Sequence, residues 1–167
     1  MLVHSKAINK LAPSDYAMIE KEHQQLEKYL ADLRDACACS LLPDSDGPAC
    51  SKEQQTSCQG RMPSFLFHII DLAGRHFDHE ESIMLSRPNI SENNDYFRVH
   101  RQAHLDIMKT LQGLADNYFD VTEKSGAAEV YRLFYEKIAG IFDEHDRQFD
   151  DPFIESTKQK SVEPNNN

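Results

Sequence analysis

The histidines of this chain fall on the apolar stripes of helices, and this placement constrains the fold more than any other feature. Apolar residues recur every three or four positions along most of the 167 residues, as on the buried face of an amphipathic helix. Four helices are predicted, near residues 14–36, 63–86, 93–119 and 127–150. Since no strand pattern or internal repeat interrupts them, we expect an all-α fold, an antiparallel up-down-up-down four-helix bundle within residues 1–156.

Two segments lack this helical periodicity. Residues 37–62 combine Pro, Gly, Ser and Gln with all four cysteines and are predicted to form a long loop, and the polar residues 157–167 are predicted to form a disordered tail. The cysteines are Cys37, Cys39, Cys50 and Cys58. Three interpretations of them stay open: inert thiols in a loop, a thiol–disulfide switch, or a second metal site whose spacing matches no standard zinc motif.

The composition narrows the classes of partner. The formal net charge is −10, whereas nucleic acids and anionic membrane surfaces both require a basic footprint, so neither is expected as a partner. No apolar run approaches the roughly 20 residues of a membrane-spanning helix. The N-terminal segment has no apolar core and no small-residue cleavage site of a secretory signal, and we therefore expect a cytoplasmic protein.

Seven ionisable residues lie on or beside the apolar stripes of the predicted helices. Within two of the helices, donors are spaced four positions apart and return to within about 40° of the same face. A single histidine in such a place is more often a core residue with a hydrogen-bond partner, but burying the whole set unpaired would cost several kcal/mol per group. The set therefore predicts a metal centre inside the bundle, formed by His23, His76, Glu80, His100, His104, His145 and Asp150.

The number and type of donors favour two metal ions. Seven donors exceed the four of a structural zinc site, and two carboxylates can be shared as bridges, so a redox-active pair of iron ions is the natural occupant. His145 and Asp150 lie five residues apart, or about 140° around an ideal helix. For both side chains to reach one cluster, a π-bulge or a loosened turn is predicted between them.

The motifs around these donors resemble the hemerythrin family, specifically its bacterial HHE-type domains. The resemblance covers roughly residues 14–152 and rests on IEKEHQQLEKYLADL at 19–33, HFDHEESIM at 76–84, HRQAH at 100–104 and HDRQFD at 145–150. It implies that His100, His104 and His145 hold one iron, that His23 and His76 hold the other, and that Glu80 and Asp150 bridge them together with an oxo or hydroxo group. One position on the second iron would then stay open for dioxygen.

This resemblance implies reversible dioxygen binding for oxygen carriage, storage or sensing, more than an enzyme activity. Phe77, Ile141 and Phe142 are candidates for an apolar wall around the open position, and Glu81 is expected to support the site or face solvent instead of bridging. One alternative is a nitric oxide or redox sensor that uses the same di-iron site, the cysteine loop and a protein partner. Another is a di-iron enzyme that reduces peroxide or nitric oxide or repairs iron–sulfur centres.

Overall fold

The computed structural model describes residues 12–36, 51–88, 90–125 and 127–158, and within these ranges the chain is helical with no strand. The prediction of an all-α fold is therefore confirmed for this part of the chain. The elements are α1 (Pro13–Asp35), α2 (Lys52–Leu85), α3 (Asp95–Asp116), α4 (Tyr118–Ser125), α5 (Ala127–His145), the π-helix η2 (Asp146–Asp150) and α6 (Asp151–Lys158). None of these helices is both long enough and apolar enough to cross a membrane.

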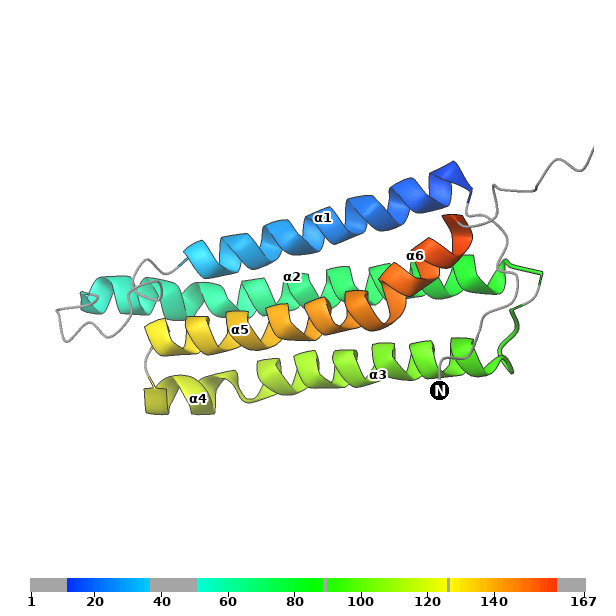
Figure 1. Cartoon of the computed structure of the whole chain (residues 1–167). Coiled ribbons are helices and arrows are strands. Elements are labelled where there is room, and N and C mark those ends of the chain that lie inside the picture. The colour runs from blue at the N-terminus through cyan, green and yellow to red at the C-terminus, as the bar shows by residue number, and fades with distance from the viewer. Residues whose placement is uncertain (1–11, 37–50, 89, 126, 159–167) are drawn as a thin grey trace, which may run out of the picture.

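The four long helices α1, α2, α3 and α5 lie alongside one another (Figure 1). α2 packs against α1, α3 and α5, and α5 also packs against α1 and α3. The apolar side chains form two buried clusters, a large one that includes Leu26, Phe77 and Phe142, and a smaller one around Ile19 and Phe153. Along each long helix, the predicted metal donors lie in sequence between residues of these two clusters, so they form a polar layer inside the core.

The N-terminal part of α2 corrects the prediction of a loop over residues 37–62, because residues 52–62 are helical. This segment includes no clear helical signal, and Pro63 inside α2 deprives the carbonyl of Gln59 of its helical N–H donor. The hydroxyl of Tyr118 takes the place of that donor, at 2.5 Å from the Gln59 carbonyl oxygen. Met62, which is fully buried, anchors the same segment to the core. Tertiary contacts therefore keep the helix continuous across the proline.

The four cysteines are only partly covered by the structure. Cys37, Cys39 and Cys50 lie outside the described residues, while Cys58 is buried on α2. Cys58 and His76 are eighteen positions apart on α2, a distance of about 27 Å along the axis. Cys58 belongs to none of the potential metal-binding groups found among the described residues. The thiol-switch interpretation stays a prediction.

The C-terminal helices also differ from their predicted boundaries. The helix predicted over residues 93–119 ends at Asp116 and is followed by the separate helix α4. The helix predicted to end at residue 150 continues as α6 to Lys158, so residues 157 and 158 belong to a helix instead of the predicted tail, and residues 159–167 lie outside the described part. Pro152 is the second residue of α6, which directly follows the π-helix η2. Phe153, fully buried beside Ile19, holds α6 against the bundle.

Candidate metal centre

The structure brings all seven predicted donors together in the core. His23 comes from α1, His76 and Glu80 from α2, His100 and His104 from α3, His145 from the end of α5 and Asp150 from the end of η2. The donors fall into two groups, and in each group one ligand atom from every residue lies within 4.8 Å of the others; a further group, His145, Asp146 and Asp150, overlaps both. The four-donor group is Glu80, His100, His104 and His145, and the three-donor group is His23, His76 and Asp150.

Asp150 joins the two groups. Its Oδ2 lies 3.1 Å from Nε2 of His23 in the three-donor group and 3.2 Å from Nδ1 of His145 in the four-donor group. Its Oδ1 lies 3.4 Å from Nε2 of His100. Asp150 therefore contacts both groups from one position.

The π-helix at Asp146–Asp150 allows the side chain of Asp150 to lie in the centre together with that of His145. A π-helix hydrogen-bonds residue i to residue i+5, so residues five apart return to the same face. His145 and Asp150 are spaced in this way, and both side chains are buried in the centre. The predicted π-bulge is therefore confirmed.

Several buried donor atoms make no hydrogen bond within the protein, although some of them lie 3.2–3.4 Å from another donor. Both carboxylate oxygens of Glu80, Oδ1 of Asp150 and Nε2 of His100, His104 and His145 are buried without a hydrogen bond. Leaving a buried polar atom unsatisfied costs about 1–3 kcal/mol, and more for a charged group. The lone pairs of these atoms could coordinate a metal cation, which would satisfy them, so the donor set fits metal binding.

Comparison with known protein families agrees with this geometry. The family model described as the hemerythrin HHE cation-binding domain matches residues 14–151, a range that includes all seven donors. The chain belongs to the hemerythrin family. Neither a search of curated proteins nor a search of solved structures returned a match.

Two carboxylates outside the donor set orient histidines of this hemerythrin-family chain. Oε1 of Glu81 accepts a hydrogen bond from Nδ1 of His104 at 2.8 Å, and Oε2 of Glu22 accepts one from Nδ1 of His76 at 3.2 Å. Because a carboxylate only accepts, Nδ1 of each ring carries the proton, and Nε2 keeps its lone pair for a metal. The supporting place of Glu81 agrees with the prediction.

Sequence reasoning missed Glu22. This residue lies three positions after Ile19 and four before Leu26, on the buried face of α1, and it is only 9% exposed. A carboxylate on an apolar stripe, next to a candidate ligand, was the signal that could have identified it. Glu22 also accepts a hydrogen bond from Nδ1 of His79 at 2.5 Å, so His79, although half-exposed, is connected to the centre through this carboxylate.

The charges of the centre shift its protonation equilibria. Burial by itself lowers the pKa of His76, but hydrogen bonds to Asp150 and Glu22 outweigh it and raise the pKa to about 10. Burial likewise opposes protonation of His145, whose pKa rises to about 9 because of Asp146 and Asp150. The surrounding histidines hold the pKa of Asp150 well below its usual range against the effect of burial. Protons and metal cations therefore compete for the same ring nitrogens.

Aromatic rings enclose the donors of the hemerythrin-family site. Phe77 stacks on His104 with ring centroids 4.1 Å apart, and it lies 5.6 Å from His76, so it touches both groups. Phe142 is buried next to Phe77, whereas Ile141 is only partly buried, and the role of these residues as a wall stays a prediction. Phe149, which sequence reasoning missed, stacks on His100 at 4.8 Å. Its position inside the π-helix, where no regular periodicity applies, concealed this contact.

Proposed function

We propose that this chain is a non-haem di-iron protein that binds dioxygen reversibly at one open iron position, for oxygen carriage, storage or sensing. The observation that carries the proposal is the cluster of five histidines and two carboxylates, all buried except the partly exposed His23, whose donor atoms converge in two groups. The chain would present this centre from an antiparallel up-down-up-down four-helix bundle, a fold that builds metal sites from facing helices.

The proposed ligands follow the two donor groups. His100, His104 and His145 would hold one iron, and His23 and His76 the other. Asp150 would bridge, which is supported by its contacts to both groups. Glu80 would be the second bridge. Its Oε2 lies 3.4 Å from Nε2 of His100 and 3.2 Å from Nε2 of His104, and neither of its buried carboxylate oxygens makes a hydrogen bond. The pair of ferrous irons would supply the electrons that dioxygen binding requires.

The open position is assigned to the iron of His23 and His76. The three-donor group contributes one protein donor fewer than the four-donor group. Its His23 side chain is 18% exposed, while the side chains of the four-donor group are between 0% and 3% exposed. A small ligand thus has both a free coordination position and a less enclosed approach on this side.

The chain's own residues favour reversible binding. Phe77 and Phe142 exclude water from the side of the centre that they cover, which limits loss of a charged product and proton leakage. The histidine-rich donor set also differs from that of di-iron carboxylate proteins, which use four carboxylates and two histidines. This difference favours binding of dioxygen over its activation for catalysis.

The test is anaerobic reconstitution with ferrous iron. Iron per chain is measured, and the visible spectrum is followed through alternating air and argon. We expect about two irons per chain and an absorption band that appears in air and disappears under argon. Irreversible conversion to an oxidised form would favour the sensor or enzyme alternatives. Less than one iron per chain would overturn the di-iron proposal.

A further inference from the structure

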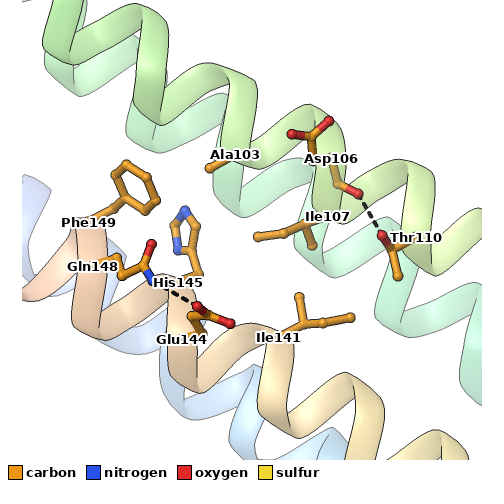
Figure 2. A pocket seen from close by; sticks show the side chains of 9 residues that line it. All are labelled: Ala103, Asp106, Ile107, Thr110, Ile141, Glu144, His145, Gln148 and Phe149. Carbon is orange, nitrogen blue, oxygen red and sulfur yellow. Dashed lines mark hydrogen bonds between the residues drawn. The ribbon is translucent and has the colours of Figure 1, made fainter.

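A cleft of about 280 Å³ opens between α3 and the segment formed by α5 and η2. Figure 2 shows that side chains from both segments line it, with His145 in the middle. Its walls combine two carboxylates and an amide with apolar side chains, namely Asp106, Glu144, Gln148, Ile107, Ile141 and Phe149. Neither the proposed dioxygen position nor the ligand set accounts for this cleft.

The mouth of the cleft carries two carboxylates without a positive partner. Asp106 extends from α3 and Glu144 from α5, and both are exposed. The side-chain amide of Gln102 donates to Asp106 at 3.0 Å, and that of Gln148 donates to Glu144 at 2.8 Å. Within the part of the chain that the structure describes, neither carboxylate forms an ion pair with a lysine or arginine. Their negative charges therefore stay available to a cation.

The inner wall of the cleft reaches the metal centre. His145 lines it, is only 3% exposed, and has a buried Nε2 without a hydrogen-bond partner. In Figure 2 its ring stands between the two helices, close to Phe149. His145 is also a member of the four-donor group, whose ligand atoms lie within 4.8 Å of one another. A cation that passed the mouth would meet a donor of the centre at the inner end.

We propose that this cleft is a loading vestibule, through which a divalent metal cation reaches the four-donor group. Asp106 and Glu144 attract the hydrated cation, since oxygen ligands suit divalent ions that keep part of their water, and His145 is the first donor of the centre that it meets. Dioxygen is uncharged and gains nothing from two carboxylates, which makes a cation the better-matched occupant. The inference rests on the proposed metal-binding function.

The experiment compares the rate of metal uptake in matched variants. Metal-free full-length protein is mixed anaerobically with Fe²⁺, and the free ion is sampled over time with a chromogenic chelator. The variant is Asp106→Asn with Glu144→Gln, which removes both charges and keeps the side-chain shapes. The control is Asp116→Asn with Glu136→Gln, the same chemical changes at exposed positions ten residues after Asp106 on α3 and eight residues before Glu144 on α5. In the control, Asp116 has the same kind of amide partner, Gln112 at 2.9 Å.

We expect the cleft variant to take up Fe²⁺ about tenfold more slowly than the control at low ionic strength, as for steered association. The difference should shrink in about 0.5 M salt, because the screening length falls below 10 Å. The final iron content should be the same in both. Equal uptake rates, or a slowing that salt does not reduce, would overturn the vestibule. Failure of all proteins to retain iron would instead overturn the proposed di-iron function.

Discussion

The two donor groups of the centre are built from the same four long helices, yet they differ in completeness and in exposure. The four-donor group is closed: three histidines and Glu80 are all buried. The three-donor group contains one donor fewer, and its His23 is partly exposed. The difference teaches that one bundle can build two donor groups of unequal access, because α1 contributes a single donor whereas α3 contributes two.

The supporting carboxylates do not explain this inequality. Each group contains one histidine held by a carboxylate, His104 by Glu81 and His76 by Glu22. The two groups therefore share this kind of support for a ring, although they differ in the number of donors. Substitutions of single residues test this comparison. The expected effects decrease from Asp150, which contacts both groups, to residues remote from both groups.

The largest effect is expected for Asp150→Ala, because Asp150 contacts both groups. We expect both positions to lose metal and the reconstituted protein to hold well below one iron per chain, measured by elemental analysis. Asp151→Ala, which removes the neighbouring exposed carboxylate, is the control and should retain the full content. Full retention in Asp150→Ala would show that the two groups do not share this residue.

A smaller and one-sided effect is expected for His23→Ala. This substitution removes a donor from the three-donor group alone, so the protein should keep about one iron per chain, on the histidines of the four-donor group, and lose the reversible spectral change in air. His104→Ala removes a donor from the other group and should reduce binding there first. If both substitutions abolish all binding, the groups form a single cooperative site.

The supporting carboxylates should produce a graded effect. Glu22→Gln weakens the hold on Nδ1 of His76, and Glu81→Gln weakens that on His104, each expected to lower metal affinity of its own group about 10- to 100-fold. Competition against a chelator of known affinity measures the change. Glu92→Gln, at an exposed position in the α2–α3 connection, supplies the control. An equal loss at both positions from either variant would contradict the separation of the groups.

The smallest effect on the centre is expected from Tyr118→Phe, at the end of the bundle remote from both groups. Loss of its hydrogen bond to the Gln59 carbonyl should lower the free energy of unfolding by about 1 kcal/mol. Urea denaturation measures it, and the iron content should not change. In a Pro63→Ala background the helix supplies its own donor to Gln59, so the Tyr118 substitution should cost less there. An equal cost in both backgrounds would refute the proline interpretation.

Much of the site could be predicted because its spacing is local. Donors four residues apart share one helix face. The pairs His76 with Glu80 and His100 with His104 could therefore be predicted from their places on the apolar stripes. The five-residue spacing of His145 and Asp150 indicated a π-helix, since a regular helix cannot aim both inward. Glu22 was missed because a glutamate beside a candidate ligand looks like an ordinary exposed residue until its partner on another helix is known.

By itself, the sequence determined the all-α fold, the seven convergent donors and the irregular turn before Asp150, because each depends on periodicity within one helix. Only the tertiary structure decided that α2 continues across Pro63 and that α6 extends the chain beyond Pro152. In both places a side chain from another part of the chain, Tyr118 or Ile19, compensates for what the local sequence disfavours. The tertiary structure also decided which donors form the fully buried four-donor group and which form the partly exposed three-donor group, since burial and the distances between helices are properties of packing.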